Sequence, residues 1–548
     1  MTLNISLPNV RLENVSGNPK LFVLNKPDSL DQDKKPWTAF LQFLSQVGEY
    51  SPYIKKITLL EKDWIKSVID QPVETIISDI ISDLRNSKPH NIINNCQRTK
   101  QRGFLIAALF DLAGFLSLDD VSKILTLVAD EILEILTELV FNHGLEADQN
   151  YEPQGSKFIS SVERETKTRS LELFVIAMGK MGAYELNYSS DIDIIFFITS
   201  TANKLNTKEK IGLRQEYIKK AKQLVKILSS VTNNDFIYRT DLRLRPDPAS
   251  TSIVISTEFA ETYYQKLGRT WERMAFIKAR FVAGNKIGAQ NFLKMLESFI
   301  WRRHFDYASI EDVKNLREKM KHNTSTINLD NLSGYNIKTG LGGIRDIELF
   351  TQTYQLIVGG KQRKLRDRKT IVSLLTLADM KWLKKEQADN LIEAYIFLRN
   401  VENRLQIINN TQTQILPNED TLKFNNLALL LGFEEPINFK NEVKRFLFYV
   451  KRLTDDFFTN FKFREVKKKD EGFGMLNLSY DKASHPPNKK EIQRLNELRS
   501  LPVFKSERAL RSFNALLPRL VSIVGSASDP AYTLDKFTNF LKTISSAV

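Results

Sequence analysis

Two aspartates stand one residue apart in the stretch GKMGAYELNYSSDIDIIFF, residues 179–197, where an apolar run begins. Side chains alternate between the two faces of a β-strand, so Asp191 and Asp193 share one face. Ile192 and Ile194 then turn toward the other face. Two carboxylates on one face repel each other unless a cation lies between them, and hard oxygen ligands at this spacing suit Mg²⁺ bound together with substrate phosphates. The pair therefore predicts a magnesium site for phosphate chemistry.

A third carboxylate follows in YRTDLRLRP, residues 238–246, together with two guanidinium groups. In a strand, Asp241, Arg243 and Arg245 would share one face, and the leucines between them would take the other. Three carboxylates suit a pair of metal ions that bridge attacking and leaving oxygens, while guanidinium forks neutralise the phosphate. The stretch therefore indicates a phosphoryl-transfer site.

A short turn, Gly179-Lys180-Met181-Gly182, comes just before the aspartate pair. A lone Asp-x-Asp is typical of a solvated strand end, and Arg-x-Arg of a polar face. Here the backbone N–H groups of the turn would approach a phosphate, and a strand, a turn and the aspartates follow one another in the proper order. The combination favours the catalytic interpretation.

The elements that must position these residues are helices and short strands. Apolar residues that recur at every third and fourth position predict helices, at 63–143, 208–231 and repeatedly after Trp271. Short apolar runs closed by turn residues predict strands, at 171–182, 190–199 and 235–246. We therefore expect an α+β protein that is mostly helical, in which one part mixes helices and strands.

The length of 548 residues exceeds what one hydrophobic core usually serves. We expect four regions: a helical one at 1–165, an α/β core at 166–320, a helical bundle at 321–465, and a linker with the start of a further helical region at 466–548. The charged stretch REVKKKDEGFG, residues 464–474, indicates the linker. The most apolar stretch, residues 103–118, is interrupted by Asp111, so we expect a buried helix and not a membrane span.

The net charge of +14 favours acidic partners such as nucleotides, nucleic acid or an acidic protein, although lysine-rich solvated faces give the same sum. Cys96 is the only cysteine, which excludes an intramolecular disulfide and a cysteine-based metal cluster. The N-terminus does not resemble a secretory signal. A reducing cytoplasm is the expected location.

The strand, glycine turn, Asp-x-Asp and later aspartate resemble the DNA polymerase beta nucleotidyltransferase superfamily. Four blocks look like the glutamine synthetase adenylyltransferase and adenylyl-removing family, in the order MGKMGAYELNYSSDIDIIF, YRTDLRLRPDP, YYQKLGRTWERMAFIKAR and IKTGLGGIRDIELFTQ. The resemblance implies a polymerase-beta-like nucleotidyltransferase core with a mixed sheet, flanked by helical domains. The sequences ELNYSSDID and GRTWERMAFIKAR are closer to those of the adenylyl-removing half. No second Gly-Lys…Asp-x-Asp block follows residue 360, so we expect one such half.

The resemblance also implies roles for individual residues. Asp191, Asp193 and Asp241 would hold Mg²⁺ and act in catalysis, and Arg243 and Arg245 would steady the incoming phosphate or the AMP phosphate. Further residues implied to contact substrate or phosphate are Gly179, Lys180, Ser190, Glu272 and Lys278. For Glu272 and Lys278 an ordinary helix surface is an equal alternative. The glycines at 340–343 could hold a phosphate at a helix N-terminus, but a structural turn is the better interpretation.

The reaction implied by the resemblance is phosphorolysis of tyrosyl-AMP on glutamine synthetase, which releases tyrosine and ADP. The partners implied are adenylylated glutamine synthetase, a PII-type signal protein, phosphate, ADP and ATP; neither a membrane nor nucleic acid is expected. Three alternatives stay open. They are ATP-dependent adenylyl transfer on the same fold, a non-catalytic module that binds glutamine synthetase or PII, and RNA nucleotidyl transfer, which would require steeply salt-dependent binding.

Overall fold

A computed structural model describes residues 7–8, 11, 36–143, 172–199, 207–232, 235–303, 312–318, 331–460 and 532–539. Contacts divide the chain into two compact units, Met1–Phe461 and Lys462–Val548. In the second unit, residues 532–539 form a helix. The predicted linker at 464–474 lies outside the described residues. The sheet, the helices around it and the candidate site belong to the first unit.

The N-terminal helices are α1 (Pro36–Tyr50), α2 (Pro52–Leu60), α3 (Lys62–Val68), α4 (Val73–Arg85), α5 (Ile92–Leu112) and α6 (Leu118–Glu138). Of these, α3–α6 confirm the helical pattern predicted for 63–143. A reciprocal pair of hydrogen bonds between Ser117 and Asp120 caps the start of α6, as its sequence favours. The apolar stretch that begins at Gly103 is the buried second half of α5. Among the described helices, none combines the length and apolar character needed to cross a membrane.

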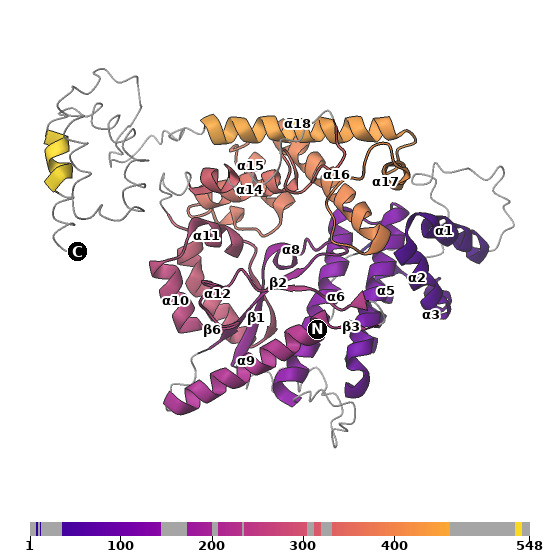
Figure 1. Ribbon diagram of the computed structural model, residues 1–548, viewed down its shortest axis with the longest axis horizontal. Coiled ribbons are helices and arrows are strands. Elements are labelled where there is room, and N and C mark those ends of the chain that lie inside the picture. The colour runs from indigo at the N-terminus through magenta and orange to yellow at the C-terminus, as the bar shows by residue number, and fades with distance from the viewer. Residues whose placement is uncertain are drawn as a thin grey trace. The chain divides into compact units, whose positions relative to one another are not determined.

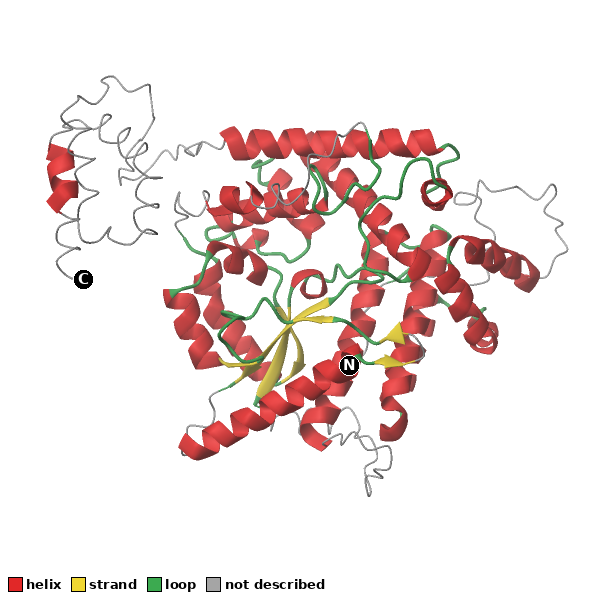
Figure 2. Cartoon of the chain, viewed as in Figure 1, coloured by secondary structure: helices red, strands yellow, loops and turns green. Residues whose placement is uncertain are grey.

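A mixed sheet forms the centre of the unit, with helices around it (Figure 2). Its strands are β1 (Leu173–Ala177), β2 (Ile192–Ile198), β5 (Thr240–Asp241), β6 (Val254–Ser256) and β7 (Arg280–Gly284). The order is β5-β2-β1-β7, and β6 also pairs with β2. Strand β2 runs antiparallel to β1 but parallel to β5 and β6, because α9 (Thr207–Ser229) carries the chain back after β2. The α+β class predicted from sequence is confirmed.

The prediction of one strand over 235–246 is wrong. The chain instead forms β3 (Val231–Thr232) paired with β4 (Asp235–Phe236), then the two-residue β5, and turns. The Asp241 carboxylate accepts the backbone N–H of Arg243 at 2.8 Å, and a strand would offer that N–H to a neighbouring strand. Pro246 has no N–H to donate. Arg243 and Arg245 therefore lie in a turn and not on a strand face.

Apolar side chains cover both faces of the sheet. In β2, Ile192 and Ile194 join the core formed with α1–α6, whereas Ile195 and Phe197 join a core formed with the helices α10 (Thr257–Lys266), α11 (Thr270–Phe276) and α12 (Lys286–Ile300). This confirms the alternation predicted around the aspartate pair. Asp193 has the parity of the second group and lies where β2 begins.

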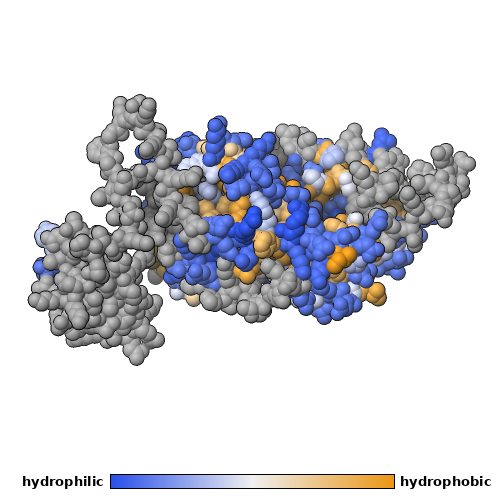
Figure 3. All heavy atoms as spheres, turned by 90° about the horizontal axis from the view of Figure 1, so that it is seen from above, coloured by the Kyte–Doolittle hydropathy of each residue, from blue (hydrophilic) through white to orange (hydrophobic). Residues whose placement is uncertain are grey.

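A helical bundle with its own core packs beside the sheet. Its helices are α14 (Ile344–Val358), α15 (Thr370–Asp379), α16 (Lys385–Asn409), α17 (Leu422–Leu430) and α18 (Pro436–Asn460). Figure 1 shows α18 running across α14–α16, with the short α8 (Gly179–Gly182) between the sheet and the bundle. The face seen in Figure 3 is mostly hydrophilic, with apolar side chains in small groups.

Candidate active site

The glycine turn lies directly against the aspartate pair. Gly179 begins α8 with a φ of 54°, and a Cβ built there would lie 2.3 Å from the Asp193 Oδ2 atom. A Cβ on Gly182 would lie 2.0 Å from the backbone oxygen of Lys278. The backbone N–H of Met178 donates to the Asp193 carbonyl at 2.8 Å. Both glycines are therefore required by close approach, and the turn sets the position of the Asp193 carboxylate.

The structure brings the three predicted carboxylates together. Asp193 in β2 is the register partner of Asp241 in the parallel strand β5, so their side chains are neighbours on one face. Asp191 comes immediately before β2. Burial, and then the nearby Asp241 carboxylate, raise the pKa of Asp193 to about 6, with a smaller contribution from Asp191. Asp193 is therefore close enough to both other carboxylates to feel their charge.

Two of these carboxylates face an arginine. The Arg239 Nε atom donates to Asp191 at 2.6 Å, and Arg243 forms a fork on Asp241 at 2.9 and 2.5 Å. Burial alone would raise the pKa of Asp241, but the hydrogen bonds from Arg243 hold it below its ordinary value. The Arg243 side chain is 85% exposed, so little packing opposes its movement away from Asp241.

The chemistry of the three carboxylates fits Mg²⁺, since hard carboxylate oxygens are its preferred protein ligands. Among the described residues, however, no three His, Cys, Asp or Glu side chains lie close enough together to hold a metal ion as they stand. To hold one, Asp191 and Asp241 would have to exchange their arginine contacts for the metal.

Arg239 is a site residue that the sequence analysis missed. Besides binding Asp191, its Nη2 atom donates to the Ser189 carbonyl at 2.7 Å, and its guanidinium lies over the Phe236 ring. The same alternation that pointed to Arg243 and Arg245 would have placed Arg239 on the face of Asp241, so the signal was present in YRTDLRLRP.

Lys180 extends from the turn toward the bundle. Its ammonium pairs with the fully buried Glu402 of α16 at 2.7 Å. Burial lowers the pKa of Lys180 to about 7, and the Glu402 carboxylate opposes the shift. Ser190 is partly buried beside Asp191, while its neighbour Ser189 binds Gln406 and Asn410 of the bundle. The loop that leads to the aspartates is thus attached to the bundle.

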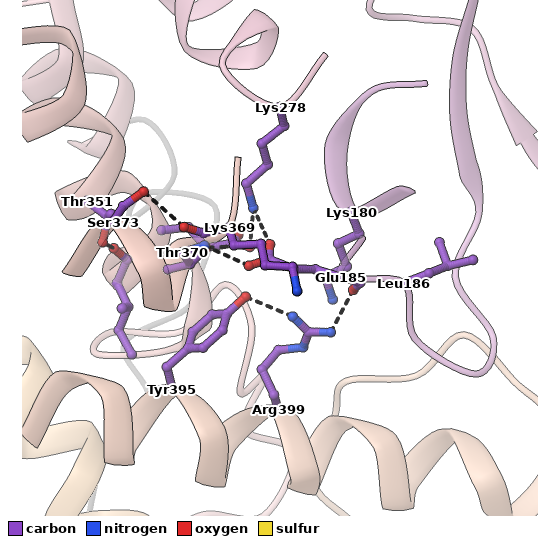
Figure 4. A network of polar contacts seen from close by, with 12 residues as sticks. Lys180, Glu185, Leu186, Lys278, Thr351, Lys369, Thr370, Ser373, Tyr395 and Arg399 are labelled. Atoms are coloured by element: carbon purple, nitrogen blue, oxygen red, sulfur yellow. Dashed lines mark hydrogen bonds and ion pairs between the residues drawn. The ribbon is translucent and has the colours of Figure 1, made fainter. Parts of the chain in front are cut away.

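Glu185 is the centre of a buried polar network next to the turn (Figure 4). Its carboxylate accepts from Lys278 at 2.7 Å and from the backbone N–H of Thr370 at 2.8 Å, while its carbonyl accepts from Arg399 at 2.7 Å. Lys278 also pairs with Glu348 at 3.2 Å. Lys278 is therefore not a helix-surface residue. Its charge is balanced by two carboxylates within a layer that joins the core to the bundle.

Two other predicted site residues have local structural contacts. The Glu272 carboxylate accepts the backbone N–H of Arg269 at 2.8 Å and so caps α11; it is buried and not on the helix surface. Arg245 donates to the carbonyls of Leu242 and Pro248 at 2.8 and 2.7 Å, which stabilises the turn after β5.

The glycines at 340–343 form a structural turn, as the sequence favoured. Gly342 has a φ of 77°, and its N–H donates to Asp346 at 2.8 Å. The first N–H groups of α14, those of Ile344 and Arg345, donate to the carbonyls of Ile337 and Lys338. These amides are therefore already bonded within the chain and do not form an anion site.

The raised pKa of Asp193 predicts how the affinity for magnesium depends on pH. With a pKa of about 6, this carboxylate is protonated in acid, and a metal ion must displace the proton. We expect Mg²⁺ affinity to rise about tenfold per pH unit up to about pH 6 and to level off above about pH 7. Calorimetric titration of the chain with MgCl₂ across this range measures the effect. An affinity that stays constant from pH 5 to 7 would contradict a role for Asp193 in binding.

Two protein-family models match successive parts of the chain. A family model described as glutamate-ammonia ligase adenylyltransferase matches residues 41–295, which include the whole carboxylate cluster. A second, described as GlnD PII-uridylyltransferase, matches residues 312–458, which include the bundle.

Curated relatives carry the name bifunctional glutamine synthetase adenylyltransferase/adenylyl-removing enzyme. The Agrobacterium fabrum protein is 31% identical over 527 residues, covering 92% of this chain and 52% of that protein. The Bartonella quintana protein is 33% identical over 419 residues, covering 75% and 42%. The Rhizobium meliloti protein is 40% identical over 299 residues, covering 55% and 30%. The chain spans about half the length of the curated relatives it matches.

These matches place the chain in the class of nucleotidyltransferases. Within that class it belongs to the glutamine synthetase adenylyltransferase family. The resemblance drawn from the four sequence blocks is confirmed.

Proposed function

We propose that this chain removes AMP from glutamine synthetase by phosphorolysis of the tyrosyl-AMP diester. An oxygen of inorganic phosphate forms a bond to the α-phosphorus while the bond from phosphorus to the tyrosine oxygen breaks. The products are ADP and a phenolate, which takes up a proton. The observation that carries the proposal is the in-register pair of Asp193 and Asp241 beside the glycine turn. The sequence around this turn resembles the adenylyl-removing half of the family.

In this proposal Asp191, Asp193 and Asp241 hold Mg²⁺, which would supply positive charge to the transferring phosphoryl group and the leaving phenolate. A tyrosine phenolate is a tolerable leaving group, since its conjugate acid has a pKa of about 10. Arg243, which is exposed and held only by Asp241, turns its guanidinium fork to the incoming phosphate. Lys180 stays with Glu402 and keeps the turn attached to the bundle.

The test compares the two directions of the reaction. The purified chain with adenylylated glutamine synthetase, Mg²⁺ and phosphate should release ADP, and omission of phosphate should stop the release. With unmodified glutamine synthetase and ATP labelled at the α-phosphate, we expect little transfer of label. Efficient Mg²⁺-dependent labelling, with release of pyrophosphate, would overturn the proposal in favour of adenylyl transfer.

A PII-type signal protein is part of the proposal as a partner. The bundle matches the family model described as GlnD PII-uridylyltransferase, and it contacts the loop before the aspartates through Gln406 and Asn410. A protein bound to the bundle would therefore act on the site through this loop. Addition of PII protein should change the rate of ADP release; an unchanged rate would remove PII from the proposal.

A further inference from the structure

One face of helix α16 holds the loop of residues 185–190, which leads to the aspartate pair. Arg399 donates to the Glu185 carbonyl at 2.7 Å and also to the Asn187 side chain; Figure 4 shows Arg399 reaching the loop beside Glu185. Two helical turns further on, the Gln406 Oε1 atom accepts the backbone N–H of Ser189 at 2.8 Å. Residues seven apart lie on the same face of a helix. The bundle therefore holds the loop at two points, the second just before Asp191.

The second half of α16 is itself fixed to the N-terminal helices. Arg404 forms two hydrogen bonds to Asp111 of α5, at 2.5 and 2.9 Å, and the Ser51 hydroxyl, at the start of α2, donates to the Ile407 carbonyl at 2.7 Å. The hydroxyl of Tyr188 in the loop donates to the same Asp111 carboxylate at 2.9 Å. Because these contacts are buried, this part of α16 keeps a fixed position relative to the loop.

Ser189 is connected to Asp191 through the guanidinium of Arg239. The Arg239 Nε atom donates to Asp191 at 2.6 Å, and its Nη2 atom donates to the Ser189 carbonyl at 2.7 Å. The guanidinium is planar and rigid, so its fork fixes the two acceptors relative to each other. Ser189 in turn is anchored by Gln406 and by the Asn410 carbonyl, which accepts from its hydroxyl at 3.1 Å. A movement of Ser189 would therefore turn Arg239 and displace the Asp191 carboxylate.

Gln406 is the part of this path that lies outside the core. Its side chain is only 1% exposed, so it is not placed to touch a substrate. What it supplies is an acceptor for the buried N–H of Ser189. Loss of that acceptor would leave the N–H unpaired unless the loop shifts, and an unpaired buried donor is costly.

We propose that Gln406 is a positioning residue for the reaction: it holds Ser189 and, through Arg239, sets the position of the Asp191 carboxylate. This deepens the proposed function and rests on the role given there to Asp191. The same contacts would position Asp191 whether the chain removes or attaches AMP.

The kinetic test uses Gln406→Met, Arg239→Gln and the double variant. Methionine keeps the length of the Gln406 side chain but removes the acceptor oxygen. Gln406→Met should lower kcat for ADP release about tenfold, while the KM for glutamine synthetase stays the same. Arg239→Gln should lower kcat at least as much, and the double variant should lose no more than Arg239→Gln alone, because the path passes through Arg239. Wild-type kcat in either single variant, or a double variant that multiplies the two losses, would overturn the proposal.

Gln355→Met is the matched control for general destabilisation. Gln355 is a buried glutamine of α14 that donates to the carbonyls of Leu365 and Asp367 inside the bundle, at 2.8 and 2.7 Å. The control should unfold at a lower temperature than wild type but keep the wild-type kcat per folded molecule. A loss of kcat equal to that of Gln406→Met would refute a specific role for Gln406.

Hydrogen exchange separates this proposal from the proposed function, because it needs no turnover. With folding checked by circular dichroism, Gln406→Met should speed amide exchange in peptides that contain residues 186–192 by up to about tenfold, and Gln355→Met should not. Faster exchange confined to Gln406→Met supports the hold on the loop even if wild type releases no ADP; the kinetic comparison is then made for AMP transfer from labelled ATP. Unchanged exchange in folded Gln406→Met would refute the proposal, whatever the activity of wild type.

Discussion

Asp193→Asn should reduce the release of ADP at least about a hundredfold while leaving the fold intact. A metal ion stabilises the charge of such a transition state by several kcal/mol, and each 1.36 kcal/mol is a factor of about ten in rate. Asparagine keeps the size of the side chain beside Gly179 but removes the charge. Initial rates of ADP release measure the loss. Retention of more than about a tenth of wild-type turnover would remove Asp193 from the metal site.

The stability of the same variant depends on pH in a defined direction. The fold raises the pKa of Asp193 from 3.8 to about 6, so the native state disfavours the ionised form. The resulting loss of stability is absent below the pKa that Asp193 has in the unfolded chain. It grows as the pH rises toward 6 and is complete above that pH. Asp193→Asn should therefore unfold at a temperature equal to or above that of wild type at pH 8 and at the same temperature at pH 3. Asp389→Asn, at an exposed position of α16, is the control and should change neither rate nor stability.

Gly179→Ala should also reduce turnover about a hundredfold or more, although it removes no charge. The new methyl group would lie 2.3 Å from Asp193 Oδ2, so the carboxylate or the turn must move. The left-handed backbone of Gly179 adds about 1–2 kcal/mol of strain for any residue with a Cβ. Rates of ADP release and thermal unfolding measure the two effects. The rate should fall by more than the loss of folded protein explains.

Gly212→Ala is the matched control for this glycine substitution. Gly212 lies in α9, and no atom lies within 4 Å of a Cβ built there. Alanine should stabilise this helix by up to about 1 kcal/mol and leave the rate unchanged. Wild-type activity in Gly179→Ala would mean that the turn does not position Asp193.

The parts of the fold that follow local rules could be predicted from the sequence. Alternation placed Ile192 and Ile194 on the face opposite Asp193, and the helical period located α9 and α14. The same rule failed after Asp241, because the Arg243 N–H bonds to the Asp241 carboxylate and Pro246 has no N–H to donate, so the strand does not continue. The alternation of apolar and polar residues does not reveal where a side chain will compete with the backbone for a hydrogen bond.

The sequence alone determined which residues could do the chemistry, namely the glycines of the turn, the Asp-x-Asp pair and a later aspartate. Their order and their spacing along the chain can be read directly from it. Tertiary structure decided the partner of each charge. Lys180 meets Glu402 across 222 positions of sequence, Lys278 meets Glu185 across 93, and Arg239 meets Asp191 across 48. Such pairs have no local pattern. The pairs of Lys180 and Lys278 form because charged groups buried where the core packs on the bundle must find an opposite charge there, whereas Arg239 and Asp191 pair within the core at partly exposed positions.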